Sequence, residues 1–482
     1  MSTTLNRTRN KWMALAVLAM TQLVVVLDGT IINIALPDAQ AGLGLTDIQR
    51  QWVVTAYALA FGALMLLGGR IADYWGRKRT YMVGMVGFGL ASLFGGLAQN
   101  GAELIAARGL QGAFAALLAP AALALLTMTF PQGKDRNTAF AIFGTVAGAG
   151  AAIGLALGGL LTEFADWRWT LLINLFFVVF GIIGGALYLE ESKAEGRNKY
   201  DVVGAVTVIL GLGSLVYGFT LSEHGWGESD TIAFIVAGVV LLALFVWVES
   251  RVKEPLLPLR VVTNKVRGAS FLIQAIAGSV TIGATLYLTL HLQLALGMSP
   301  LNAGLATLPM PLATMALAVF ITNLLPKVGP RPLMIVGPLI IAASFLYLSF
   351  VTAGGSYVVQ VLPALIIMGV GLAFVVVPLQ NLSLTGVAPH DAGVASATAN
   401  SATQIGGSIG LSVFTAVYVA TVNSGVEVTD QASQLEAFAG GYGSVFIAAA
   451  VGMVAASIIS ATLIRGKKED LLPDGPSAVG AH

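Results

Sequence analysis

Fourteen long apolar runs constrain this chain more than any other feature of its sequence. Each run has the roughly 20 residues that a helix needs to cross a bilayer, and charged or Gly-, Pro- and Asn-rich breaks separate the runs. The chain has 56% hydrophobic and only 10% charged residues, against about 25% charged in soluble domains. Water therefore cannot be its main solvent. We predict an all-α polytopic membrane protein with transmembrane helices near 12–36, 50–69, 80–98, 103–128, 138–161, 169–189, 202–221, 231–248, 268–296, 301–325, 332–352, 357–378, 392–421 and 440–464.

The basic residues lie in alternate connecting segments. If the N-terminus is inside, every Lys and Arg except Arg50, Arg108 and Arg168 falls in a segment on that side. Cytoplasmic loops of membrane proteins carry this excess of basic residues. We therefore expect both termini in the cytoplasm and a multi-pass location in a bacterial-type cytoplasmic (inner) membrane.

An internal repeat indicates two related halves. The segment 43–46 (Leu-Gly-Leu-Thr) matches 296–299 (Leu-Gly-Met-Ser) at an offset of 253 residues, and the same offset relates Gly76 to Gly329. An even number of spans separates the copies, so they share one orientation, as in transporters whose substrate site lies between parallel repeats. We predict two six-helix pseudo-symmetric halves with two inserted helices between them: an N-terminal half at 1–190, the inserted pair with its linkers at 191–267, a C-terminal half at 268–465 and a cytoplasmic tail at 466–482.

Two charges stand inside apolar runs. Asp28 lies well within the first run and Arg108 lies in the fourth. A charge at mid-membrane costs about 3 kcal/mol and usually faces a partner or cavity on a proton, ion or substrate path. The alternatives are an interfacial position for Asp28 and outward snorkelling for Arg108. We expect Asp28 to carry a coupling proton, and Arg108 to pair with an acid or line a cavity, with Gln111 on the same helix face.

Other chemistry is excluded by composition and motif. The chain has no Cys, and its four His are scattered along the sequence, so we expect neither a disulfide nor a metal site. The glycine clusters lack the Gly-Lys-Ser/Thr ending of a phosphate-binding loop. With a net charge of +1 there is no field to attract nucleic acid. We expect no cofactor, no nucleotide and no enzymatic activity, and a proton gradient as the energy source.

The loop after the second run carries a family motif. Residues 69–79 read Gly-Arg-Ile-Ala-Asp-Tyr-Trp-Gly-Arg-Lys-Arg. Topology alone accounts for the basic residues, but the spacing Gly-x-x-x-Asp-x-x-Gly-Arg-Lys resembles the signature of the major facilitator superfamily. The resemblance implies a cytoplasmic gating loop, a charge latch that steadies the outward-facing state, formed by Gly69, Asp73, Gly76, Arg77 and Lys78.

Further motifs resemble the fourteen-helix drug:proton antiporter branch of that superfamily. They include Leu-Asp-x-Thr-Ile-x-Asn-x-Ala-Leu-Pro around Asp28, Arg-x-x-Gln-Gly at Arg108, and the landmarks 166–169 with Asn174. The resemblance implies that Arg108 favours the ionised form of a nearby carboxylate and releases it when the halves move apart.

The fifth run carries a stripe of small residues. Gly150, Gly154 and Gly158 recur every four residues, which by itself predicts close helix packing. The stripe also resembles the branch's antiporter motif. Leu155 stands where that motif has Pro, and this departure weakens the antiport inference.

The second half offers few ionisable groups in its apolar runs. This absence favours neutral, lipophilic or monovalent cationic substrates. His291 could titrate near neutral pH, although a lone His in such a place is more often a hydrogen-bonded structural residue. The polar side chains that we expect at a substrate cavity are Asn33, Tyr57, Gln111, His291, Gln293, Asn400 and Gln404.

Together these features predict a monomeric secondary transporter that exports lipophilic or amphipathic drugs, cationic or neutral, across the membrane by proton antiport with alternating access. Its partners would be small lipophilic substrates, protons and membrane lipids. One alternative is a transporter of a lipid or lipid-like metabolite with drugs as incidental cargo. Another is a membrane scaffold or sensor, which the two buried charges disfavour.

Overall fold

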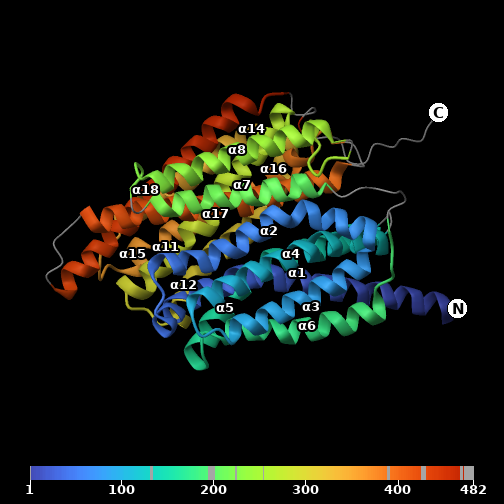
Figure 1. Ribbon diagram of the computed structural model, residues 1–482, viewed down its shortest axis with the longest axis horizontal. Helices are drawn as coiled ribbons and strands as arrows, with labels where there is room; N and C mark the ends of the chain where they lie inside the picture. The colour runs from blue at the N-terminus through green and yellow to red at the C-terminus, as the bar shows by residue number, and fades with distance from the viewer. Residues whose placement is uncertain are drawn as a thin grey trace.

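The computed structural model describes residues 2–130, 134–193, 201–222, 225–252, 254–387, 391–424, 430–466 and 471, and within these it is almost entirely helical (Figure 1). The N-terminal half consists of α1 (Ser2–Leu43), α2 (Asp47–Trp75), α3 (Arg77–Gly96), α4 (Gly101–Thr129), α5 (Lys134–Phe164) and α6 (Trp169–Tyr188). The inserted pair is α7 (Val202–Leu221) and α8 (Ser229–Arg251).

The C-terminal half contains three spans that are interrupted along their length. They are α10 (Lys265–Gly278) with η2 (Ser279–Ala284), α11 (Thr285–Leu290) and η3 (His291–Ala295); α12 (Pro300–Thr307) with α13 (Pro309–Val328); and α15 (Tyr357–Gln360) with α16 (Leu362–Leu384). The uninterrupted spans are α14 (Pro330–Leu348), α17 (Ala392–Ser424) and α18 (Gln431–Leu463), and the short α9 (Leu259–Val262) precedes α10.

Thirteen helices in the described residues are long and apolar enough to cross a membrane, and α3 is the fourteenth helix of membrane length. Its three basic residues at 77–79 and its glycines lower its mean hydropathy. Even so, α3 presents an apolar stripe at helical spacing, as a lipid-facing helix does. The exposed members of that stripe are Val83, Val86, Leu90, Leu93 and Leu97. The prediction of a polytopic all-α membrane protein is confirmed.

The packing of the first six helices recurs in the last six. Contacts α2–α4, α1–α5, α3–α4 and α3–α6 correspond to α13–α16, α10–α17, α14–α16 and α14–α18. The repeated turns also match, because Gly44 and Gly297 have φ values of 62° and 63°, and Thr46 and Ser299 cap α2 and α12 with their side chains. Only glycine adopts such a φ freely, so the repeat seen in the sequence is a repeat of turn geometry.

The two halves meet through related pairs of helices, α2 with α17 and α5 with α12. We call the end of the molecule where α1 begins the N-terminal end. The described polar contacts between transmembrane helices of the two halves lie at the opposite end. Gln51 donates to the Ser412 hydroxyl at 2.7 Å, and Gln293 donates to the Ile34 carbonyl at 2.8 Å. By contrast, Gly148, midway along α5, and Gly393, at the start of α17, have no other group within 4 Å of where a Cβ would stand. In the described residues, the polar contacts between the transmembrane helices of the two halves therefore lie at the opposite end.

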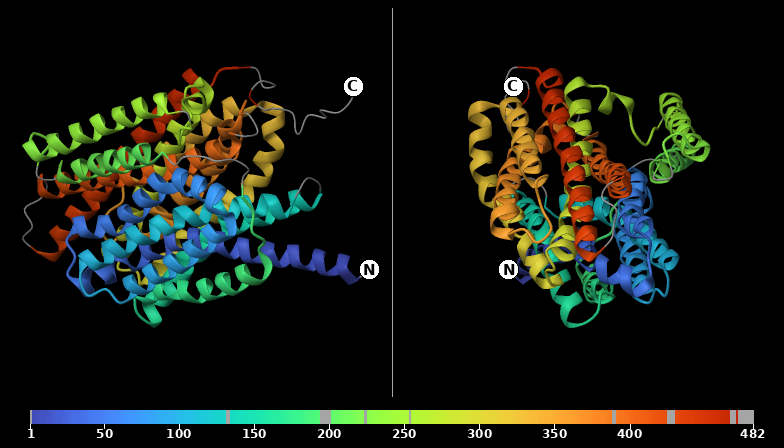
Figure 2. Two further views of the ribbon diagram at one scale, coloured as in Figure 1. Left: turned by 45° about the vertical axis from the view of Figure 1, so that its right-hand side comes forward. Right: turned by 90° about the vertical axis from the view of Figure 1, so that its left-hand side faces the viewer.

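The inserted pair lies at the side of the bundle. In the right-hand view of Figure 2, the green α7 and α8 stand apart from the two main groups of helices. Helix α7 packs on α2 and on α17, so the pair contacts both halves. Of the predicted tail at 466–482, Gly466 and Leu471 are among the described residues, whereas basic residues such as Arg197 and Lys199 lie outside them.

Candidate functional site

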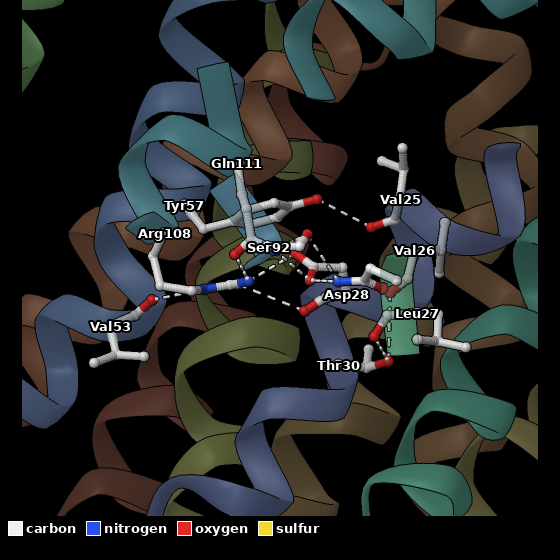
Figure 3. Close-up of polar contacts among 11 residues, drawn as sticks. Val25, Val26, Leu27, Asp28, Thr30, Val53, Tyr57, Ser92, Arg108 and Gln111 are labelled. Carbon is white, nitrogen blue, oxygen red and sulfur yellow. Dashed lines mark hydrogen bonds and ion pairs between the residues drawn. The ribbon is translucent and has the colours of Figure 1, made fainter. Parts of the chain in front are cut away.

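A buried ion pair joins α1 to α4. Asp28 and Arg108 are both 0% exposed, and Arg108 Nη1 lies 2.6 Å from Asp28 Oδ2 (Figure 3). Arg108 therefore pairs with an acid rather than snorkelling, and Asp28 lies in the interior rather than at an interface. Removing two charges from water costs several kcal/mol per ion unless close geometry and further hydrogen bonds compensate.

Those further hydrogen bonds come from amide side chains of two helices. Gln111 on α4 and Asn174 on α6 both donate to Asp28 Oδ1, at 3.0 and 2.7 Å. Arg108 also donates to Gln111 Oε1 at 2.9 Å, which fixes the orientation of that amide. Gln111 donates in addition to Ser92 Oγ on α3 at 2.8 Å. Three side chains thus donate to one carboxylate, an arrangement that fits an ionised Asp28.

Helix α2 covers the other side of the arginine. Arg108 Nε donates to the Val53 carbonyl at 3.1 Å, and its guanidinium carbon lies 4.4 Å from the centre of the Tyr57 ring. The Tyr57 hydroxyl donates to the Val25 carbonyl at 3.0 Å, one turn before Asp28. The ring therefore links α1, α2 and α4 over the ion pair, and a cation over an aromatic face is itself favourable.

Sequence comparison places this site in a known family. The sequence profile of the Major Facilitator Superfamily matches residues 18–411. The chain belongs to this superfamily. The puromycin resistance protein of Streptomyces alboniger is 41% identical over 97% of this chain and 94% of its own length. The cephamycin export protein of Amycolatopsis lactamdurans is 35% identical over 95% and 93%.

Solved structures of other transporters share the fold. The crystal structure of a POT family transporter is similar with a TM-score of 0.68, covering 94% of this chain and 98% of that one at 15% sequence identity. At this identity the likeness concerns the fold alone.

Most of the described contacts of the superfamily loop motif at 69–78 lie within or next to the N-terminal half. Arg77 Nη2 bonds to Asp73 at 2.9 Å, and Gly76 has a φ of +128°, which disfavours any side chain there. The carboxylate of Glu191, after α6, accepts from the first backbone N–H groups of α3 at 3.1 Å. Lys78 Nζ donates to the Leu189 carbonyl at 2.7 Å. Gly69 packs near Pro120 of α4.

The glycine stripe of α5 packs against the helix that carries Asp28. A Cβ on Gly150 would lie 3.3 Å from Leu23 and Val26 side chains, and one on Gly158 would meet the Ile31 carbonyl oxygen at 2.5 Å. Gly154 lies against Thr30 and the Leu27 carbonyl. The stripe therefore sets the position of α1 on both sides of residue 28. Leu155, in the place of the motif proline, lies with its carbonyl against Gly304 of α12, so this segment also contacts the other half.

The remaining predicted cavity residues do not join the ion-pair network. Asn33 is 5% exposed with its Oδ1 unpartnered in the described residues. Gln293 bridges to α1 as described above, Asn400 is exposed and donates to the Ser396 carbonyl on its own helix, and Gln404 lies against Gly62 of α2.

One reading of the sequence was wrong. We expected a structural His291 to be hydrogen-bonded, yet this fully buried ring has no hydrogen-bond partner at either nitrogen among the described residues. Its neighbour is aromatic, with the Tyr442 ring centre 5.7 Å away, edge to face. The His291 ring is therefore positioned by packing against the Tyr442 ring.

Sequence reasoning gave no role to two members of the network. Asn174 stood out only as a family landmark, and Ser92 was missed. Both are polar residues in otherwise apolar runs, on helices 3 and 6. That is the only signal that could have found them, because nothing local to either sequence indicates a distant carboxylate.

Proposed function

We propose that this chain exports lipophilic or amphipathic compounds, neutral or singly cationic, across the cytoplasmic membrane in exchange for protons. The observation that carries the proposal is the buried Asp28–Arg108 pair. A charge pair kept in a membrane helix bundle is costly, and titratable groups in such places serve proton or ion pathways. The names of the puromycin and cephamycin relatives support antibiotic-like small molecules as the cargo, whereas the proposed charge rests on the few ionisable groups in the apolar runs of the second half.

The orientation follows from charge. Basic residues at the described helix ends gather at the N-terminal end, among them Arg70, Arg79, Arg251, Arg331 and Arg465. By the positive-inside rule this end is cytoplasmic, and we assign both termini to that side of the inner membrane. Because the described polar contacts between the membrane helices of the two halves lie at the opposite end, we assign the present conformation to the inward-facing state. We propose a monomer as the working unit.

Coupling uses the hydrogen-bond network as a two-state element. In the present conformation every donor on Asp28 matches its ionised form, so a proton can bind only when Arg108 moves off Oδ2. Rocking of the halves would move α1 against α4, with the α5 glycine stripe as the packing surface. A proton taken up outside lowers the cost of burying Asp28 without its partner, and substrate binds again after the proton leaves inside. Antiport requires that proton and substrate favour opposite states.

Proton release on substrate binding is the direct test. Puromycin would be added to purified protein in weakly buffered detergent, using wild type, Asp28→Asn and the control Asp38→Asn, which changes an exposed carboxylate on the same helix. We expect release from wild type and the control only. In everted membrane vesicles, an imposed pH gradient should drive puromycin uptake by the same two proteins.

Full gradient-driven uptake by Asp28→Asn would refute the coupling role. A cephamycin provides a second probe: because it carries a carboxylate, transport of it in place of puromycin would overturn the proposed substrate charge. Tight co-purification of one class of endogenous lipid, with neither probe bound, would favour the lipid-transport alternative.

A further inference from the structure

Two buried acids lie close together where the inserted helices reach the N-terminal end of the molecule. Asp201 caps α7, with Oδ1 accepting from the Gly204 N–H at 2.7 Å. Glu249 lies in the last turn of α8, and its Oε2 accepts from the Leu257 N–H at 2.9 Å. Their side chains are well buried, since Asp201 is 7% exposed and Glu249 3%. Neither belongs to the Asp28 network.

The other oxygen of each acid has no hydrogen-bond donor in the described residues. These atoms are Asp201 Oδ2 and Glu249 Oε1. Both face Gly204, because a Cβ there would lie 2.5 Å from Oδ2 and 2.7 Å from Oε1. Both atoms therefore lie within 2.7 Å of one point, and the two carboxyl groups are neighbours. Two oxygens that lack a donor in the described residues therefore lie beside the same glycine, whose missing side chain leaves room for both.

The charged groups around the pair do not neutralise it. In the described part of the chain neither acid forms a salt bridge, and the adjoining connection presents the backbone N–H groups of Leu256 and Leu257 to Glu249. Arg251 on α8 lies over the Trp247 ring. Neighbouring buried carboxylates repel each other when both are ionised, so one proton held between them is the favoured state.

The connection that Glu249 holds is joined to both halves. We call residues 252–264, between α8 and α10, the strap; Lys253 lies outside the described residues. Arg70, near the C-terminus of α2, donates to the Pro255 carbonyl at 2.8 Å. On the other side Arg260 makes two bonds to Asp391, at 2.8 and 3.0 Å, just before α17. The strap thus bridges the ends of α2 and α17, two helices that meet at the interface between the halves.

A second residue of the C-terminal half, Arg267, also forms hydrogen bonds with the strap. Arg267 on α10 donates to the Arg260 and Val261 carbonyls, at 2.7 and 2.9 Å, and to the Thr385 carbonyl at the end of α16 at 3.0 Å. Hydrogen bonds to the Asp391 carboxylate raise the pKa of Arg260, so this anchor remains charged. Arg70 and Glu249 each make a single hydrogen bond to a neutral backbone group of the strap. These two hydrogen bonds are therefore the ones that can break.

We propose that Asp201 and Glu249 form a proton-binding site that holds one shared proton, and that its occupancy fixes the strap across the inner ends of the two halves. With the proton bound, Glu249 stays in place and holds Leu257. When the proton leaves, the two charges repel, Glu249 turns toward water, and the strap loses that hydrogen bond. The hydrogen bond between Glu249 and the strap is therefore present at low pH and lost as the pH rises. The consequence for transport rests on the proposed function, but the proton site does not.

Hydrogen exchange of the full-length protein tests the site directly. Exchange at strap peptides would be measured at low and high pH and corrected for the intrinsic chemical rate. We expect wild-type strap amides to exchange about tenfold faster at high pH, equivalent to about 1.4 kcal/mol. Glu249→Gln should remain slow at both, because Gln keeps an acceptor for Leu257 and can donate to Asp201. The control Glu228→Gln, an exposed acid before α8, should behave as wild type.

A spectroscopic readout keeps the test independent of folding. Wild type should show an infrared carboxylic-acid band that titrates, and both Glu249→Gln and Asp201→Asn should lack it; Asn remains a good helix cap. Equal pH dependence of the strap in wild type and Glu249→Gln would overturn the proposal. Protection of the wild-type strap at high pH by sodium or potassium alone would also overturn it, in favour of a bound cation.

Puromycin uptake separates this proposal from the proposed function. If the chain exports puromycin, Glu249→Gln should still transport it with Asp28 intact, but with a flatter dependence on internal pH. If no variant transports puromycin, the proposed function fails while exchange and infrared data still decide the proton site.

Discussion

The coupling between Asp28 and Arg108 can be measured by a double-mutant cycle of Asp28→Asn, Arg108→Met and the double variant. Both residues are fully buried, so either single change leaves an uncompensated charge or an unmatched partner, which costs about 3–5 kcal/mol. Asn at position 28 would keep much of the hydrogen bonding. If the Asn174 amide rotates by half a turn, its Oδ1, which has no partner in the described residues, can accept a hydrogen bond from the amide nitrogen of the new Asn side chain. What the single variant loses is mainly charge compensation.

The double variant removes both charges together. We therefore expect it to cost less than the sum of the single variants, by about 3 kcal/mol, since neighbouring groups in one network are not additive. Arg108→Met alone should recover stability on acidification, because protonating Asp28 removes the uncompensated charge. The unfolding free energy would be measured by titrating SDS into nonionic micelles, with circular dichroism as the readout.

A surface ion pair provides the control. Lys11 and Asp135 lie 2.6 Å apart with side chains 28% and 57% exposed, and pairs of this kind contribute less than about 1 kcal/mol. A coupling energy for Asp28–Arg108 no larger than that of the control pair would refute the reasoning, because the two residues would then act independently.

Three smaller changes test the packing near the Asp28–Arg108 pair and the turn at Gly76. Gly154→Ala should lower stability by about 1–3 kcal/mol, because a Cβ there overlaps Thr30; Gly148→Ala, with nothing within 4 Å, should be neutral in the same thermal-shift assay, and equal effects would contradict the packing argument. Gly76→Ala should cost about 1–3 kcal/mol through its φ of +128°, and an unchanged melting temperature would show that the turn adapts. Tyr57→Phe should lose the bond to the α1 backbone, worth about 1 kcal/mol, yet retain ring contact with the arginine; a loss as large as that of Tyr57→Leu would mean that the ring contributes little.

The spans and the buried pair were largely readable from sequence for a physical reason. A bilayer imposes a local requirement, because each crossing segment must be apolar over its own length. Even α3 was found, although its basic start and glycines weaken its hydropathy. Asp28 and Arg108 stood out because charges are rare in such segments, and with so few acids in the membrane the partner of Arg108 was nearly determined.

The sequence by itself determined where the chain crosses the membrane, which turns repeat, and that Asp28 and Arg108 are charges inside the membrane spans. Only the tertiary structure decided what surrounds those charges. Asn174 reaches Asp28 across 146 residues of chain, and Glu249 faces Asp201 only because α7 and α8 pack as a hairpin. His291 lies among aromatic rings without a hydrogen bond for the same reason. Hydropathy is a property of one segment, whereas a hydrogen-bond partner depends on how distant helices pack together.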